Sequence, residues 1–238
     1  MNHGEDSRMR SVLIVGATSG VGRALAKVLS ADCELWTVSR RADPDNGAYH
    51  VQWDATSGGI PAGVLPERLD GLVYCPGSIR LLPFSRLTDR MFLEDLEINL
   101  LGAVRALRSA LASLQSSSEA SVVLFSTVAV TTGLPMHASV AAAKGALEGL
   151  TRSLAAEFAP KIRVNAIAPS VTDTALAAGI LRNERQRRTA AERHPLKRIG
   201  RAEDIAGVTR FLLSRESGWM TGQILPVDGG LGALRLFN

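Results

Sequence analysis

The chain has 238 residues, enough for one large α/β domain or two small ones with a buried core. Hydrophobic residues make up 46% and charged residues 21%, as in an ordinary globular protein, and the net charge of +4 is too evenly spread to indicate a nucleic-acid partner. The sequence contains neither a signal-peptide pattern nor the apolar run of about 18–20 residues that a membrane span needs, and its two cysteines lack metal-ligand spacing. We therefore expect a cytoplasmic protein without a metal site, with a loose polar tail over residues 1–10.

Two kinds of apolar segment alternate along the chain. Residues 11–17 are a short β-branched run ending near glycine, which predicts a buried strand, and residues 22–31 have the spacing of an amphipathic helix. A second strand over 33–40 completes a βαβ unit. The further predicted elements are strands over 49–56, 69–77, 120–127, 162–170 and 222–230, a long helix over 88–114 with a Thr/Asp cap, a helix from the alanine-rich segment 137–150 to about Phe158, and a helix over 203–213.

The order of these elements predicts the fold class. Strands and helices alternate with short connections, which is typical of an α/β protein with a Rossmann-like, doubly wound parallel sheet and helices on both faces. We assign residues 11–238 to this single three-layer α/β/α domain. The longest irregular segment, about 171–202, is expected to be an insertion over the functional site, because long loops in compact domains are more often functional lids than not.

The turn after the first strand predicts a nucleotide site. The segment "GATSGVG" lies between the first strand and the first helix, where glycines permit a tight turn and let the backbone approach a pyrophosphate at the helix N-terminus. A tight turn without a ligand is the alternative interpretation. The residues of this segment that we assign to cofactor binding are Gly16, Thr18, Ser19, Gly20, Val21 and Gly22.

The end of the second strand bears on which dinucleotide binds. An NAD site usually ends this strand with an acid that accepts a hydrogen bond from the ribose 2′-hydroxyl, but here Ser39 takes that place and Arg40 and Arg41 follow. Guanidinium groups pair well with a 2′-phosphate, so the pattern favours NADP(H) over NAD(H), unless an arginine simply faces water. Asp54 ends the third strand at the same sheet edge and is expected to meet the adenine, with a surface turn as the alternative.

With these segments in place, the chain resembles the short-chain dehydrogenase/reductase family over nearly its whole length. The matching pieces, in order, are "GATSGVG", "WDAT", "LDGLVYCPG", "INLLGA", "SVVLFSTVAV", "AAAKGALEGLTRSLAAEFAP", "IRVNAIAPSVTDT", "RIGRAEDIAG" and "TGQILPVDGG". Their order and spacing are similar to those of β-ketoacyl carrier-protein reductases. The resemblance implies a nicotinamide-dependent oxidoreductase that reduces a carbonyl or oxidises an alcohol, whose identity the sequence leaves open.

The resemblance also implies roles for single residues. The family uses an Asn, Ser, Tyr and Lys tetrad, in which Ser and Tyr hold the substrate oxygen, Tyr passes the proton, Lys lowers the tyrosine pKa and holds the cofactor ribose, and Asn supports a relay water. The asparagine matches Asn99, the lysine matches Lys144, and the serine matches Thr127, with Ser126 just before it. The further cofactor residues are Ala55, Gly77, Asn99, Lys144, Pro169, Thr172 and Thr174, the last at the position that contacts the nicotinamide carboxamide.

The position of the family's tyrosine holds Val140, which cannot donate a proton. Other departures are Val15 before the first glycine, "YCPG" in place of "NNAG", and Ser170 after the sixth strand. One interpretation is an enzyme with a relocated acid/base group. His137 is the first candidate, because its ordinary pKa of about 6.5 suits proton transfer and, if the helix extends to it, helical spacing puts it on nearly the same face as Lys144. The alternative interpretation is a loop histidine at a subunit contact or at the helix start. The alternative is an inactive relative that binds NADP(H) as a sensor or scaffold.

The resemblance further implies an oligomer, because relatives are mostly homotetramers or dimers. The helix with Lys144 carries small and apolar residues in "GALEGLTRSLAAEFA", which suit helix packing between subunits. We expect a homotetramer, with a dimer as the alternative, a small-molecule substrate, and no nucleic-acid or membrane partner. Substrate choice in the family depends on the segment after the sixth strand, here about 171–200, and its arginines do not identify a substrate.

Overall fold

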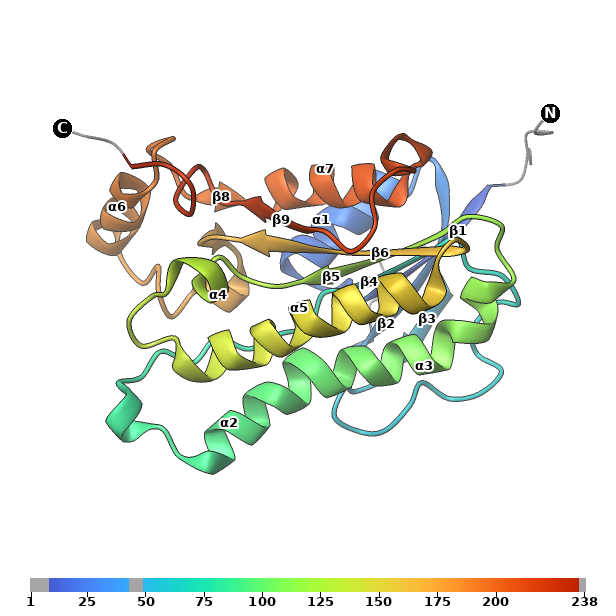
Figure 1. Cartoon of the computed structure of the whole chain (residues 1–238), viewed down its shortest axis with the longest axis horizontal. Helices are drawn as coiled ribbons and strands as arrows, with labels where there is room; N and C mark the ends of the chain where they lie inside the picture. The colour runs from blue at the N-terminus through green and yellow to red at the C-terminus, as the bar shows by residue number, and fades with distance from the viewer. Residues whose placement is uncertain (1–8, 43–48, 236–238) are drawn as a thin grey trace.

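The structure, a computed structural model, describes residues 9–42 and 49–235. At its centre lies a parallel sheet of seven strands in the order β3-β2-β1-β4-β5-β6-β9 (Figure 1). The chain crosses back over β1 between β3 and β4, which makes the sheet doubly wound and confirms the predicted fold class. The strands are β1 (Arg10–Val15), β2 (Cys33–Ser39), β3 (Tyr49–Gln52), β4 (Gly71–Tyr74), β5 (Ala120–Phe125), β6 (Ile162–Pro169) and β9 (Ile224–Val227).

Helices cover both faces of the sheet (Figure 1). On one face α1 (Gly20–Leu29) packs beside α7 (Ala202–Leu213), and on the other lie α2 (Asp89–Leu96), α3 (Gly102–Gln115) and α5 (Ala138–Phe158). Alternate residues of one strand enter different cores: Leu72 of β4 belongs to the cluster under α3 and α5, and Val73 to the cluster under α1 and α7. Burial on both faces explains why the strands read as continuous apolar runs.

The helix expected over 88–114 is confirmed, with Thr88 as its cap, but it contains an irregular turn that the sequence did not predict. A π-helical turn, η3 (Glu97–Leu101), separates α2 from α3. The Tyr74 hydroxyl donates a hydrogen bond to the Ile98 carbonyl oxygen at 2.7 Å, and Gly102 gives it room, since a Cβ there would lie 2.2 Å from that hydroxyl. A side chain that enters the helical hydrogen-bond ladder accounts for the irregular turn, and π turns are frequent at functional sites.

The segment 171–202 contains regular structure, whereas the sequence suggested an irregular loop. It holds the short parallel pair β7 (Thr172–Asp173) and β8 (Gly200–Arg201), the turn η4 (Ala175–Ala177), and α6 (Glu184–Arg193). Ala190 is the one buried residue of α6. A helix with so little apolar surface lacks the periodic pattern by which helices are recognised.

The remaining boundaries differ by a few residues. β1 begins at Arg10, within the expected tail, while residues 1–8 lie outside the described part of the chain. β3, β4 and β9 end earlier than predicted, at Gln52, Tyr74 and Val227. The short elements are η2 (Phe84–Arg86), α4 (Ala129–Thr132) and η5 (Arg215–Ser217). Within the described ranges, no helix is long and apolar enough to cross a membrane.

Candidate active site

A cavity of about 610 Å³ opens at the carboxyl edge of the sheet, where β1 and β4 are neighbours and the strand order reverses. Doubly wound folds bind their ligands at this point. The sequence-predicted residues that line the cavity are Gly16, Thr18, Ser19, Gly20, Val21, Gly22, Ser39, Arg40, Arg41, Asp54, Ala55, Gly77 and Thr174. Four predicted cofactor residues are not part of the lining: Asn99, Lys144, Pro169 and Thr172.

The turn from β1 into α1 requires glycine at three positions. Gly16 and Gly20 have φ angles of +86° and +53°, which L side chains rarely adopt, and a Cβ on Gly22 would lie 2.2 Å from the Gly16 carbonyl oxygen. The N-cap residue Ser19 makes no side-chain cap, and α1 has no acid in its first turn. The N-terminal N–H groups and the positive end of the helix dipole therefore fit the pyrophosphate of a dinucleotide.

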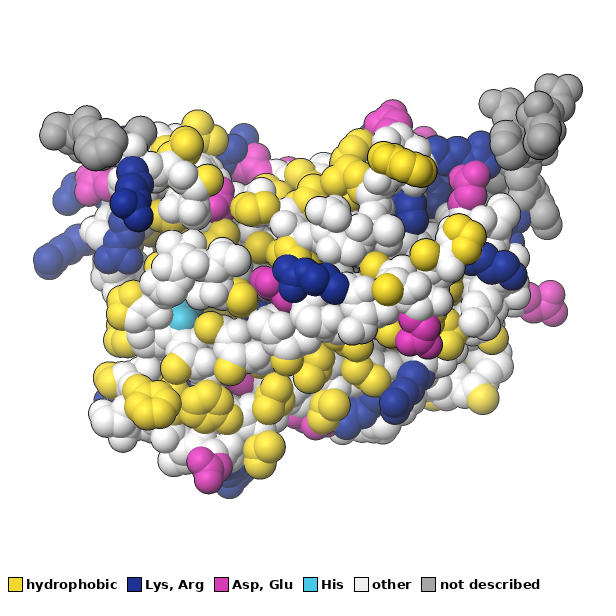
Figure 2. All heavy atoms as spheres, in the orientation of Figure 1, with side chains coloured by type: hydrophobic (Ala, Val, Ile, Leu, Met, Phe, Trp, Pro, Cys, Tyr) yellow, Lys and Arg dark blue, Asp and Glu magenta, His cyan; other side chains and the backbone are white. Residues whose placement is uncertain are grey.

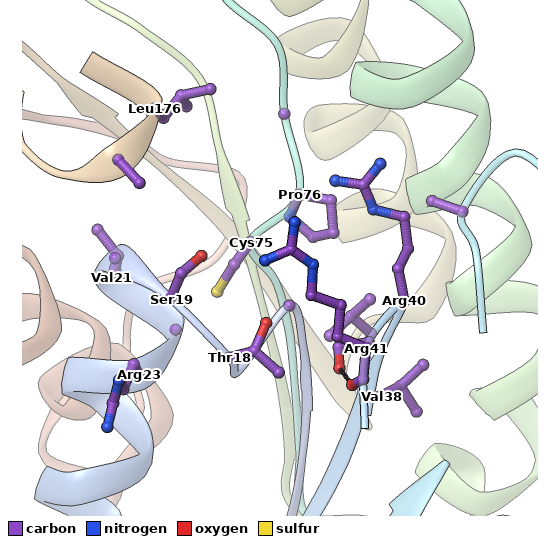
Figure 3. Close-up of a pocket in the computed structure, with 18 of the residues that line it drawn as sticks. Thr18, Ser19, Val21, Arg23, Val38, Arg40, Arg41, Cys75, Pro76 and Leu176 are labelled. Carbon is purple, nitrogen blue, oxygen red and sulfur yellow. Dashed lines mark hydrogen bonds between the residues drawn. The ribbon is translucent and has the colours of Figure 1, made fainter. Parts of the chain in front are cut away.

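The opposite wall of the cavity is cationic. Arg40 and Arg41 extend from the end of β2 along the cavity, with Thr18 and Ser19 on the other side (Figure 3). Arg23 of α1 also belongs to the lining, and Asp54 is its single acid. The Ser39 hydroxyl donates to the Arg41 carbonyl oxygen at 2.6 Å, which shapes the turn that presents both guanidinium groups. This charge balance suits a phosphorylated ligand.

Asp54 is held by its own turn. Its Oδ1 accepts hydrogen bonds from the Thr56 N–H at 2.9 Å and from the Thr56 hydroxyl at 2.8 Å. These bonds lower the pKa of the Asp54 carboxyl, the backbone bond most of all. Arg105 donates to the carbonyl oxygen of the next residue, Ala55, at 2.9 Å. Asp54 is thus both a surface turn residue and part of the cavity wall, so the two interpretations of it are compatible.

Three predicted residues come together at Gly77, which is part of the cavity lining. Lys144 Nζ donates to the Phe125 carbonyl oxygen at 2.6 Å, and burial lowers the pKa of Lys144 to about 8. A Cβ on Gly77 would lie 3.5 Å from Lys144 Nζ and 3.0 Å from Asn99 Oδ1. Gly77 therefore lets the lysine and the asparagine approach the same stretch of backbone.

The two candidate hydroxyls after β5 differ in their surroundings. Ser126 is buried, and its hydroxyl donates to Glu148 Oε1 at 2.7 Å. Thr127 is half-buried, and its hydroxyl accepts a 3.3 Å bond from the Ala129 N–H. Thr127 thus keeps its hydroxyl proton free for another acceptor, whereas the Ser126 proton is engaged in a hydrogen bond to the Glu148 carboxylate. Val140 is buried in α5, one turn before Lys144.

His137 is the N-cap of α5, so the expectation that the helix already includes it was wrong. Its Nδ1 donates to the Pro135 carbonyl oxygen at 2.8 Å, which leaves Nε2 as the acceptor of a neutral ring. The neighbouring Met136 carbonyl oxygen accepts a bond from the Leu82 N–H at 3.2 Å. This bond brings the loop after Gly77 against the start of α5.

Sequence reasoning missed ten residues of the cavity wall. Most of them flank predicted ones at the ends of β1, β2, β3 and β4, so extending each motif by one residue would have found them. Ile98 had no signal of its own, because it reaches the cavity only through the π turn. The missed residues are Val15, Arg23, Val38, Ala42, Trp53, Cys75, Pro76, Ile98, Ala175 and Leu176.

Comparison with known proteins identifies the family of the chain. Residues 61–232 match the family model described as enoyl-(acyl carrier protein) reductase. The chain is 31% identical to the 3-oxoacyl-[acyl-carrier-protein] reductase MabA of Mycobacterium avium over 94% of this chain and 90% of the relative. The protein belongs to the short-chain dehydrogenase/reductase family. The ligand-free aldohexose dehydrogenase of Thermoplasma acidophilum superposes with a TM-score of 0.86, at 25% identity over 97% of each chain.

A second similar solved structure contains the cofactor expected here. The ElxO protein with NADP bound superposes with a TM-score of 0.82, at 26% identity over 94% of this chain and 99% of that one. In the present chain, the Thr174 side chain lies beside the glycine turn, 3.4 Å from where a Cβ of Gly20 would be. Pro169 accepts a bond from the Val128 N–H, and the Thr172 hydroxyl donates to the Ser170 carbonyl oxygen. Within the described residues, no cluster of three metal-ligating side chains occurs.

Proposed function

We propose that the protein is an NADP(H)-dependent oxidoreductase that reduces a carbonyl or oxidises an alcohol at an atypical active site. The observation that carries this proposal is the cavity, with its glycine turn at one wall and Arg40 and Arg41 at the other. The 2′-phosphate distinguishes NADP from NAD, and paired guanidinium groups without an acid at Ser39 favour the phosphorylated form.

The proposed roles of the site residues follow their surroundings. The bound nicotinamide supplies the hydride. Lys144 holds the cofactor ribose from below Gly77, and Asn99 orders the polar groups beside it. Thr127 polarises the substrate oxygen with its free hydroxyl proton. The preceding residue, Ser126, fixes the backbone beside Thr127 through its hydrogen bond to Glu148.

His137 is one candidate for the proton-exchanging group in place of tyrosine. Its ring is fixed by Pro135 with Nε2 available, so a neutral ring would accept a proton during alcohol oxidation and a protonated ring would donate one during reduction. Replacing His137 by alanine tests this role, because turnover unchanged in the variant would remove the histidine from the mechanism.

An inactive NADP(H)-binding relative is the second candidate function. Val140 favours it, since a buried aliphatic side chain stands one turn before Lys144 and offers no proton. NADPH binding is measured by fluorescence, and NADPH oxidation is then followed with ketones, quinones and a 3-oxoacyl thioester. Binding with turnover supports the enzyme, binding without turnover supports the sensor or scaffold, and absence of binding contradicts both.

We further propose a cytoplasmic homotetramer, with a dimer as the alternative. Apolar side chains that a monomer would leave in water include Phe84, Leu93, Leu101 and Met136. Figure 2 shows hydrophobic side chains gathered over α2, α3 and α5 on the face that these helices cover. Fractionation of the cells that produce the protein would test the location.

A further inference from the structure

A row of polar groups leads from Gly77 into the protein toward α2. Ser78 Oγ donates to Asp95 Oδ1 at 2.6 Å. Asn99 Nδ2 donates to Ser78 Oγ at 2.9 Å, and the Ser78 N–H donates to Asn99 Oδ1 at 3.3 Å. Ser78 therefore lies between a carboxylate and an amide, directly after the glycine that Lys144 and Asn99 approach.

Burial of the Asp95 carboxyl at this position lowers the stability of the fold. Its side chain is 0% exposed, and Oδ2 has no hydrogen-bond partner among the described residues. A buried polar atom without a partner costs about 1–3 kcal/mol, and an apolar residue of α2 at this point would avoid that cost. The short bond from Ser78 has the length of a charge-assisted hydrogen bond between a hydroxyl and a carboxylate.

We propose that Ser78, backed by Asp95, exchanges the proton with the substrate oxygen and so replaces the acid/base group that Val140 cannot supply. This inference rests on the proposed oxidoreductase function and names the group that completes it. Ser78 is half-buried and directly follows Gly77 of the cavity lining, while the Asp95 side chain behind it is shielded from water. The bond between Leu82 and Met136 holds the Ser78 loop against the segment that leads into α5.

The hydrogen bonds balance in both directions of the reaction. In alcohol oxidation the substrate O–H donates to Ser78 Oγ, Ser78 donates to the Asp95 carboxylate, and Asn99 donates to Ser78. The substrate proton passes to Ser78 as the Ser78 proton passes to Asp95, while the hydride leaves the substrate carbon for the cofactor. In reduction the Asp95 carboxyl donates to Ser78 and Ser78 gives its proton to the carbonyl oxygen; after the product leaves, a proton from solvent returns to Asp95 through Ser78.

Steady-state kinetics of four variants test this proposal. We measure kcat and KM with NADPH and the best probe among the ketones, quinones and 3-oxoacyl thioester, and the Kd of NADPH by fluorescence. We expect kcat to fall about 10²–10³-fold in Asp95→Asn and Ser78→Ala, with KM and Kd changed less than about threefold, because general acid–base catalysis acts on the chemical step. Ser78→Thr keeps the hydroxyl and should recover kcat to within about tenfold of the wild type. Glu94→Gln is the matched control, since this neighbouring carboxylate pairs with Arg80 and Arg90 at the surface.

A solvent isotope effect supplies a readout that a merely structural role would not move. The solvent deuterium isotope effect on kcat should increase in Asp95→Asn, where proton transfer becomes slower than the other steps. Values of kcat within about threefold of wild type in both Ser78→Ala and Asp95→Asn would overturn the inference and leave the proposed oxidoreductase intact. A loss of kcat in His137→Ala with none in Ser78→Ala would also overturn it. If the wild type binds NADPH but shows no turnover, the proposed oxidoreductase function and this inference both fail. If Asp95→Asn does not fold, the kcat of Ser78→Ala alone decides.

Discussion

At the level of single side chains, Arg40 and Arg41 are the basis of the proposed preference for NADP(H). Each guanidinium that pairs with a 2′-phosphate contributes a charge-assisted hydrogen bond of about 1.5–3 kcal/mol. We expect Arg40→Ala and Arg41→Ala each to raise the Kd of NADPH by about tenfold or more while the Kd of NADH stays within about twofold. Titration of cofactor fluorescence measures both constants. Arg90→Ala, an exposed arginine of α2 outside the cavity, should change neither, and equal losses for NADPH and NADH would contradict the preference.

Lys144 is a buried cation, and the effect of its burial on the stability of the fold can be measured. Burial lowers its pKa from 10.5 to about 8, so the folded state holds this proton less tightly than the unfolded chain. The charged lysine therefore destabilises the fold below pH 8, by about 3 kcal/mol at neutral pH, and this cost fades as the pH rises toward 10.5. Cofactor binding would compensate for it.

Replacement of this lysine should therefore separate stability from binding. We expect Lys144→Met to raise the Tm at pH 7 by a few degrees and to lose the gain at pH 10, while NADPH binding weakens at least about tenfold. The lost bond to the Phe125 carbonyl oxygen offsets part of the gain. Thermal melts at both pH values check this, with the exposed Lys161→Met as control. The prediction would be contradicted if the Tm difference between Lys144→Met and wild type were smaller at pH 7 than at pH 10.

At the level of elements, His194 fastens α6 to the end of β6. The buried ring donates from Nδ1 to the Ala190 carbonyl oxygen at 2.7 Å and accepts at Nε2 from the Ser170 hydroxyl at 2.8 Å. These bonds tie the insertion to the sheet at a residue that departs from the family's glycine. The bidentate pair of Arg187 and Asp173 lies at the surface and contributes less.

The insertion should loosen when this histidine is removed. We expect His194→Ala to cost about 1–3 kcal/mol and to speed amide hydrogen exchange over residues 184–201, with exchange in β1 and β4 unchanged. Hydrogen exchange read by mass spectrometry measures this. Arg187→Ala is the control, because loss of an exposed ion pair should leave most of the protection in place. Uniformly faster exchange in the whole sheet would show that His194 stabilises the domain and not the insertion alone.

The elements also show what could be read from the sequence. The strands and the glycine turn were predictable because burial on both faces and left-handed backbone angles permit few residue types. The π turn was not, since Asn99 and Ile98 lie in an ordinary helical pattern and the distortion comes from the Tyr74 hydroxyl, far away in the chain. α6 had one usable signal, Asn183, whose side chain accepts from the Gln186 N–H as an N-cap. The partner of a catalytic group, such as Asp95 behind Ser78, depends on tertiary contacts and had no sequence signal.

The whole molecule presents an apolar helical face that assembly would cover. We expect light scattering after size-exclusion chromatography to give about four times the chain mass, or twice for a dimer. Ala146→Arg, on the exposed side of α5, should reduce the mass because a buried unpaired guanidinium disfavours the interface. Ser30→Arg, after α1 on the opposite face, should leave the mass unchanged. A monomeric wild type would contradict the proposed assembly.

The position of Trp53 makes the tryptophan fluorescence of the protein sensitive to the contents of the cavity. Its indole forms part of the cavity wall, is 6% exposed, and donates to the Gly58 carbonyl oxygen at 3.2 Å, whereas Trp219 lies fully in solvent. Energy transfer to a bound reduced nicotinamide quenches the emission of an indole in the wall of the same cavity, while that of a solvated indole on another surface is less affected. Trp219→Phe should therefore leave a protein whose remaining emission, from Trp53 and Trp36, falls as NADPH enters, so that the occupancy of the site can be followed continuously without a label.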